Sequence, residues 1–143
     1  MAEPFCPNIR RLLFEQAQAL QISSYAQGTV VTIEGPRFST RAESNLFSSW
    51  HADVINMSTV PEVVLAREAG MHYAAVAIVT DYDCWKVHEK AVDISSVFAE
   101  FKKNVEKVKQ LLIQSIGNIE EDHSCSCQTD ITSAVIETLE RKH

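Results

Sequence analysis

One run of the sequence constrains the fold more than any other. Residues 72–79, HYAAVAIV, are apolar almost without interruption, and the polar residues Thr80 and Asp81 follow at once. A short apolar run of this kind, ending at a polar loop, is typical of a strand that is buried on both faces. Such strands belong to parallel sheets covered by helices on both sides. We therefore expect an α/β fold.

Strand-like and helix-like patterns alternate around this run. β-branched residues predict further strands within 25–33 and at 54–55. Apolar residues at three- and four-residue spacing, with proline, glycine and hydroxyl residues at their ends, predict helices over about 8–21, 40–50, 61–69, 94–116 and 131–139. Ser39 or Thr40 could cap the second of these helices, with Glu43 at the spacing of a capping box. Only about three strands can be counted, fewer than the five or six of a typical sheet. We expect a mixed sheet flanked by helices that lacks its first strands.

Composition and charge limit the classes of function that we expect for this chain. A chain of 143 residues that is 45% hydrophobic and 22% charged is typical of one soluble globular domain. Its formal net charge of -6 gives no reason to expect nucleic-acid binding. No apolar run approaches the roughly 20 residues of a membrane span, and the N-terminus does not resemble a signal peptide. We expect a cytoplasmic protein, with the nucleus as a second compartment, that binds a small molecule.

Two carboxylates follow the apolar run directly. Asp81 and Asp83 are two residues apart and would point the same way if the segment stays extended. Repulsion between them favours one carboxyl group keeping its proton, which it could donate to a leaving group. The alternative is a surface turn in which the two side chains bond to the nearby backbone.

Two other strand ends carry polar and aromatic residues. Gly35, Phe38 and Ser39 could form the pocket of a flat heterocycle, or the segment could be a plain connection in which Arg37 pairs with Glu43 and Phe38 is core. Residues 56–62, NMSTVPE, could hold an anion at a helix N-terminus. Alternatively, the hydroxyl groups there only cap the helix and the methionine fills the core.

Three segments resemble the S-methyl-5'-thioadenosine phosphorylases of the purine nucleoside phosphorylase family, in the order that the family has them. They are residues 28–43 (GTVVTIEGPRFSTRAE), 53–62 (DVINMSTVPE) and 80–85 (TDYDCW). The resemblance extends over residues 1–116, and it implies the C-terminal half of such an enzyme. It assigns 1–117 to the C-terminal part of a nucleoside phosphorylase domain, and 118–143 to a linker and a short C-terminal helix.

The resemblance also implies an activity and a site. The reaction would be phosphorolysis of S-methyl-5'-thioadenosine to adenine and 5-methylthioribose 1-phosphate in a homotrimer, with inorganic phosphate as co-substrate and no metal or organic cofactor. Asp81 would be the catalytic acid that protonates the leaving purine. Ser58 would contact phosphate. The other substrate-binding residues implied are Phe38, Ser39, Met57, Asp83, Ile94, Val97 and Phe98.

Other functions stay open at this point. Relatives that act on 6-oxopurines use asparagine in the base pocket, so Asp81 favours adenine over purine nucleoside phosphorylase activity on inosine or guanosine. The family's glycine-rich phosphate loop and its other phosphate ligands have no counterpart in this sequence. The chain could therefore be a catalytically silent fragment that only binds nucleoside or associates with full-length subunits.

The cysteines are the last feature of note. Cys6 and Cys84 show no paired spacing, whereas Cys125 and Cys127 form a C-x-C pair. Some members of the family have a similar pair, which is interpreted there as a redox or stabilising disulfide. Two cysteines alone make an incomplete zinc site. We expect two free thiols with a structural role, on a mobile linker over 118–130.

Overall fold

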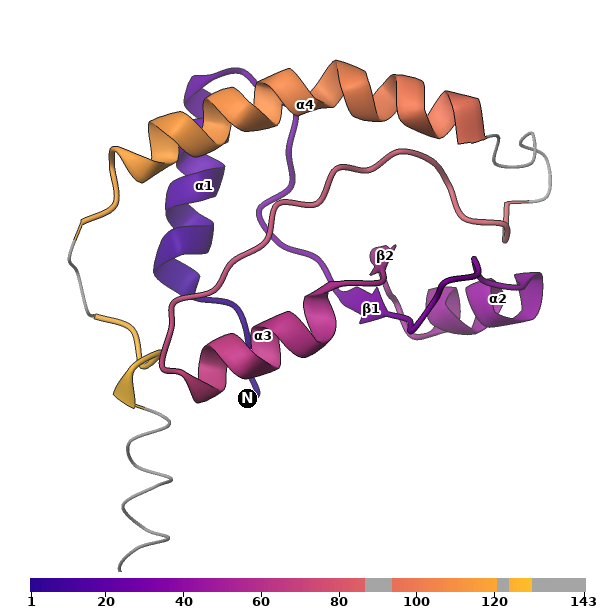
Figure 1. Cartoon of the computed structure of the whole chain (residues 1–143), viewed down its shortest axis with the longest axis horizontal. Helices are drawn as coiled ribbons and strands as arrows, with labels where there is room; N and C mark the ends of the chain where they lie inside the picture. Colours follow the sequence, from indigo (N-terminus) through magenta and orange to yellow (C-terminus); the bar gives the residue numbers. More distant parts are fainter. Residues whose placement is uncertain (87–93, 121–123, 130–143) are drawn as a thin grey trace, which may run out of the picture.

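The computed structural model describes residues 1–86, 94–120 and 124–129. Figure 1 shows helices around one small sheet, and most predicted elements are present within a few residues of their expected ends. The terminal helix predicted over 131–139 lies outside the described residues. The elements are α1 (Pro7–Ala19), β1 (Val30–Thr32), α2 (Arg41–Ser49), β2 (Val54–Asn56), α3 (Thr59–Glu68) and α4 (Ile94–Ile116).

The sheet in the described part of the chain consists of β1 and β2. The two strands are parallel, with Val30 opposite Val54 and Thr32 opposite Asn56, and α2 is the crossover helix between them. Before the strands begin, the backbone N–H of Thr29 donates to the carboxylate of Asp53 at 2.7 Å. The parallel pair agrees with the predicted α/β class, although β1 is shorter than the strand expected within 25–33.

The strand predicted over residues 72–79 is wrong. These residues form an irregular segment that runs below α4 in Figure 1 and pairs with no strand in the described chain. A strand needs a neighbour to complete its backbone hydrogen bonds, and burial on both faces needs covering layers. In the described residues the segment has no strand partner, and Val79 is 65% exposed. The apolar pattern is therefore typical of a buried strand, but these residues do not form one by themselves.

The packed core is small and lies at two places. One is the crossing of α1 and α4, where Ala17 and Leu111 are buried and Gln114 Nε2 donates to Gln16 Oε1 at 2.7 Å. The other surrounds the start of α1, where Cys6 is fully buried. Three residues of the apolar stripe predicted for α4 remain exposed, namely Phe98, Phe101 and Leu112, and so do Ile113 and Ile116 on the same helix.

The end of α3 follows its sequence signals. Gly70 has a positive φ of 68°, which ends the helix as predicted. Within 1–86, 94–120 and 124–129, the structure contains no helix with the length and apolar character needed to cross a membrane.

Candidate active site

The carboxyl ends of β1 and β2 bring two of the predicted site segments together. Because the strands are parallel, the loops that follow them leave the sheet at the same edge. The pairing continues one step beyond the strands, since the backbone N–H of Ile33 donates to the carbonyl oxygen of Asn56 at 2.8 Å. The side chains of Thr32 and Asn56 are also hydrogen bonded, at 2.9 Å. The loops that begin at Ile33 and Met57 therefore start side by side.

Gly35 and Met57 make the closest approach between these two loops. Gly35 has a positive φ of 68°, and a Cβ atom there would lie 2.7 Å from the sulfur of Met57. Only glycine fits this position without a shift of Met57. Met57 itself is 39% exposed, so the alternative in which it fills the core is wrong.

Ser58 stands at the N-terminus of α3 without capping it. Its side chain makes no capping hydrogen bond, and the residue is exposed. Instead, the side-chain oxygen of Asn56 accepts from the backbone N–H of Thr59 at 3.4 Å, and the Asn56 amide also donates to the Thr59 hydroxyl. The simple capping alternative is thus wrong for Ser58, and the backbone of Val60 is extended, so the regular turns of α3 begin only after it.

The loop between β1 and α2 is fixed by a capping box. The hydroxyl of Thr40 accepts from the backbone N–H of Glu43 at 3.3 Å, and the Glu43 carboxylate accepts from the backbone N–H of Thr40 at 2.7 Å. Arg37 donates to both carboxylate oxygens of Glu43, at 2.7 and 2.6 Å. The predicted box is confirmed, and so is the ion pair of the alternative interpretation. Phe38, however, is 67% exposed and is not core.

This arrangement shifts the ionisation of both charged partners. Hydrogen bonds from Arg37 and then from Thr40 hold the pKa of Glu43 well below its usual range. The hydrogen bond to Glu43 and its charge raise the pKa of Arg37. The pair therefore stays ionised over the physiological range and holds Phe38 and Ser39 in a loop of fixed shape.

The third predicted segment, 80–85, is docked on the same loop. The thiol of Cys84 donates to the carbonyl oxygen of Ser39 at 3.4 Å, and Arg41 Nε donates to the carbonyl oxygen of Cys84 at 3.3 Å. Sequence reasoning missed these two positioning residues, because both contacts use backbone carbonyls of residues more than 40 positions away. Together they place the Asp81–Asp83 segment next to Ser39.

The two carboxylates of this segment have different surroundings. Asp81 is exposed and accepts from the hydroxyl of Thr80 at 2.7 Å. Asp83 is half-buried and accepts from the backbone N–H of Cys84 at 2.8 Å. Asp83 is therefore held by the loop, whereas the Asp81 carboxylate faces solvent.

The apolar part of the predicted site lies on the first turns of α4. Phe98 is 60% exposed, and the side chains of Ile94 and Val97 lie outside the described part of the structure. Their role beside the nucleoside stays a prediction.

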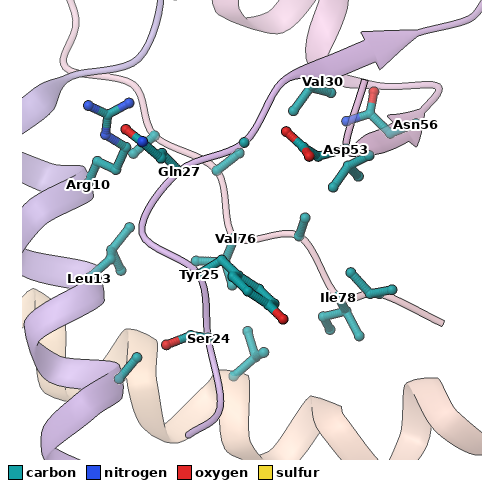
Figure 2. A pocket seen from close by; sticks show the side chains of 18 of the residues that line it. Arg10, Leu13, Ser24, Tyr25, Gln27, Val30, Asp53, Asn56, Val76 and Ile78 are labelled. Atoms are coloured by element: carbon teal, nitrogen blue, oxygen red, sulfur yellow. The ribbon is translucent and has the colours of Figure 1, made fainter. Parts of the chain in front are cut away.

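A large open pocket lies beside these loops. Its volume is about 1420 Å³, and it is bounded by α1, residues 22–30, residues 73–82 and α4. Figure 2 shows Leu13, Val76 and Ile78 around it, with Arg10 and Asp53 among its polar residues. Small-molecule pockets typically measure about 300 to 1,000 Å³. The size and apolar lining are those of an uncovered core face. Of the predicted site residues, Ser58 and Asp81 line this pocket, whereas Phe38, Ser39 and Met57 do not.

Comparison with known proteins identifies the family of this chain. Residues 1–117 match the profile of the phosphorylase superfamily. The chain belongs to this superfamily. The resemblance to S-methyl-5'-thioadenosine phosphorylase is confirmed by relatives of that name. The phosphorylase from Danio rerio is 53% identical over 135 residues, which cover 94% of this chain and 46% of that protein. The phosphorylase from Pyrococcus furiosus is 51% identical over 127 residues, which cover 89% of this chain and 48% of that protein.

Solved structures of phosphorylases share the fold. Methylthioadenosine phosphorylase from Schistosoma mansoni in complex with adenine has a TM-score of 0.84 and 38% identity, covering 96% of this chain and 54% of that one. A variant of the Schistosoma mansoni adenosine/methylthioadenosine phosphorylase in complex with methylthioadenosine has a TM-score of 0.82 at 38% identity, covering 96% and 52%. The chain thus spans about half the length of the phosphorylases that it matches.

Proposed function

We propose that this chain supplies the nucleoside-binding half of an S-methyl-5'-thioadenosine phosphorylase. The reaction converts S-methyl-5'-thioadenosine and inorganic phosphate to adenine and 5-methylthioribose 1-phosphate. The observation that carries the proposal is the meeting of three loops, 33–40, 57–58 and 80–85, at the carboxyl edge of the parallel pair. This is where ligands bind in open α/β sheets. The names of the relatives support the choice of nucleoside.

The exposed residues of these loops suit the parts of the nucleoside. The ring of Phe38 is free to stack on adenine, with Ser39 beside it. Met57 offers an apolar thioether surface to the ribose. Ile94, Val97 and Phe98, at the start of α4, would line the methylthio group, which prefers an apolar wall to a polar one.

Asp81 and Asp83 would act on the purine. When the glycosidic bond breaks, its electron pair passes to the purine ring, and Asp81 donates a proton to the imidazole-ring nitrogen that gains basicity. Asp83, which the loop holds in place, accepts from the 6-amino group. A phosphate oxygen then forms the new bond to the anomeric carbon. A 6-oxo group would meet a carboxylate that repels it, which argues against inosine and guanosine.

Phosphate binding is the incomplete part of the site. Ser58 is exposed and precedes α3, whose regular turns begin after the extended Val60, and the N-terminal end of a helix favours an anion. The resemblance attributes the other phosphate ligands to the first half of the family fold. We therefore propose that turnover needs that half, in a homotrimer located in the cytoplasm and the nucleus, with phosphate as the co-substrate.

Adenine release tests the proposal. The chain would be joined behind the matching first half of the Danio rerio relative, hereafter the joined protein, and supplied with S-methyl-5'-thioadenosine and phosphate. We expect phosphate-dependent adenine release by the joined protein, and none by the first half alone. A folded joined protein with no such activity would contradict the proposal.

The second candidate is a silent protein that associates with longer subunits, and the open apolar pocket of about 1420 Å³ favours it. Mixing the chain with a full-length phosphorylase separates the two candidates. Co-elution of the mixture, together with an inactive joined protein, would favour the silent role.

A further inference from the structure

Four side chains with metal-binding atoms meet at the start of α1. They are Cys6, His72, Cys125 and Cys127, and their sulfur and nitrogen atoms all lie within 4.8 Å of one another. Cys6 precedes α1, His72 follows α3, and the other two belong to the segment 124–129. The fold thus brings together residues as far apart in the sequence as Cys6 and Cys127.

The distances within this cluster fit a tetrahedral zinc ion. With Zn–S bonds of about 2.3 Å and Zn–N bonds of about 2.0 to 2.1 Å, tetrahedral angles place two sulfurs about 3.8 Å apart and a sulfur and a nitrogen about 3.5 Å apart. The sulfurs of Cys6 and Cys125 are 3.8 Å apart. Nδ1 of His72 lies 3.4 Å from the Cys6 sulfur and 3.2 Å from the Cys125 sulfur. We propose that Cys6, His72, Cys125 and Cys127 form a Cys3His site for Zn²⁺.

Contacts outside the cluster hold the ligands in place. The backbone N–H of Cys6 donates to the carbonyl oxygen of Tyr73 at 2.7 Å, and the rings of Phe5 and Tyr73 are stacked with centroids 5.9 Å apart. Asn8 donates to the hydroxyl of Ser124 at 2.9 Å. Cys6 is fully buried and Cys127 is 2% exposed, so water has little access to these two sulfurs. The site is therefore preorganised, and binding requires little rearrangement.

The role of this zinc is structural. Four protein ligands leave no open coordination position for a substrate or a reactive water. In Figure 1, the segment 124–129 lies by the turn after α3, whereas the 81–86 segment ends near α2 on the other side of the view. The metal joins the 124–129 segment to the start of α1 and the end of α3, far from the nucleoside loops.

This metal could not be expected from the sequence, because only Cys125 and Cys127 are close in the chain. A single histidine and a distant cysteine carry no spacing signal. The proposal also differs from a disulfide, since all four cysteines of the chain are free thiols.

Zinc binding to the reduced chain tests the proposal directly. The 143-residue chain, fused to a cysteine-free soluble carrier and kept in a phosphine reductant, would be titrated with Zn²⁺ against a chromophoric chelator. We expect one zinc per chain. Co²⁺ in its place should give the intense visible bands of a tetrahedral thiolate site. Loss of a residue that only hydrogen bonds to a metal ligand typically lowers metal affinity by about 10- to 100-fold. Cys6→Ser or Cys127→Ser removes a ligand itself and should therefore weaken zinc binding by at least about 100-fold.

Matched variants distinguish the loss of a zinc ligand from a general effect of the substitution on folding. Cys84→Ser removes the cysteine that lies outside the cluster and should leave zinc affinity unchanged. His72→Ala should weaken binding, whereas His72→Cys keeps four ligands and should retain it. Uptake of less than half an equivalent of zinc would overturn the proposal, as would a cobalt spectrum without thiolate bands. Equal effects of Cys84→Ser and Cys127→Ser, or a Cys125–Cys127 disulfide that persists under reductant and excess zinc, would also overturn it.

Discussion

Asp81 and Asp83 are two residues apart, but their carboxylates have different surroundings in the fold. Asp83 is held by the backbone of Cys84, while the carboxylate of Asp81 reaches solvent beside Thr80. A proton donor must reach the purine, and the exposed Asp81 is more accessible for that role than the half-buried Asp83. The structure is therefore compatible with Asp81 as the acid and Asp83 as the residue that orients the base.

Removal of the Asp81 carboxylate should impair catalysis and leave the fold intact. In the joined protein, Asp81→Asn should lower kcat for S-methyl-5'-thioadenosine by roughly 100- to 10,000-fold, the usual effect of losing a general acid, while activity on 6-oxopurine nucleosides rises relative to it. Steady-state adenine release measures the first effect. Glu68→Gln, at an exposed position in α3, is the matched control and should change neither kcat nor the relative activity on 6-oxopurine nucleosides. An unchanged rate with Asp81→Asn would mean that Asp81 only forms part of a turn.

The capping box of α2 gives a prediction at the scale of one element. Thr40→Ala removes the side-chain acceptor of the Glu43 backbone N–H, so it should lower the free energy of unfolding of the joined protein by about 1 kcal/mol, as measured by urea denaturation. Ser48→Ala, at an exposed position near the end of the same helix, is the control. A Thr40→Ala variant as stable as the parent would show that the box contributes nothing.

The stabilisation from Glu43 should depend on pH with a defined sign. Because the folded state lowers the pKa of Glu43, its contribution is full above the ordinary carboxyl pKa of about 4.3 and is lost as the pH falls below it. The difference in stability between the parent and Glu43→Gln should therefore be larger at pH 7 than at pH 3. Urea midpoints at the two pH values measure it. A difference that grows on acidification would contradict the assigned ion pair with Arg37.

The segment 72–79 should become a strand when neighbours are supplied. Its apolar pattern fits a buried strand, yet in the described chain it has no strand partner. Backbone amides without hydrogen-bond partners exchange rapidly with solvent. We expect fast hydrogen exchange over these residues in the chain alone and strong protection in the joined protein, measured by mass spectrometry, with α1 as the internal reference. Equal exchange in both proteins would mean that the segment is a loop of the fold.

Local signals explain what sequence reasoning predicted correctly. Three features depend on residues that are close in the chain and could therefore be predicted: the capping box at Thr40 and Glu43, the glycine after α3 and the periodicity of α4. The strand at 72–79 was not, because a strand depends on partners that periodicity does not reveal. The contacts of Arg41 with Cys84 and of Cys6 with His72 were missed for the same reason, since folding alone brings these residues together.

At the scale of the whole molecule, the chain exposes surface that a complete fold would bury. Tyr25, Val79, Ile113 and Ile116 are 95%, 65%, 74% and 67% exposed, and the open pocket has an apolar lining. Exposed apolar surface of this extent marks an interface or a tendency to associate. We expect the chain alone to self-associate or to be poorly soluble, and to show no measurable phosphorolysis. Size-exclusion chromatography paired with an adenine-release assay checks both. A monodisperse and active 143-residue protein would show that other groups in this chain hold phosphate.

The choice of nucleoside is the central claim for the assembled enzyme. It depends on the carboxylates of the 80–85 loop, which suit an amino-purine, and on the apolar first turns of α4, which suit a methylthio group. The most direct test is the ratio of kcat/KM for S-methyl-5'-thioadenosine to that for inosine, measured with the joined protein in phosphate buffer. We expect a ratio far above one. Comparable kcat/KM values for the two nucleosides would contradict it.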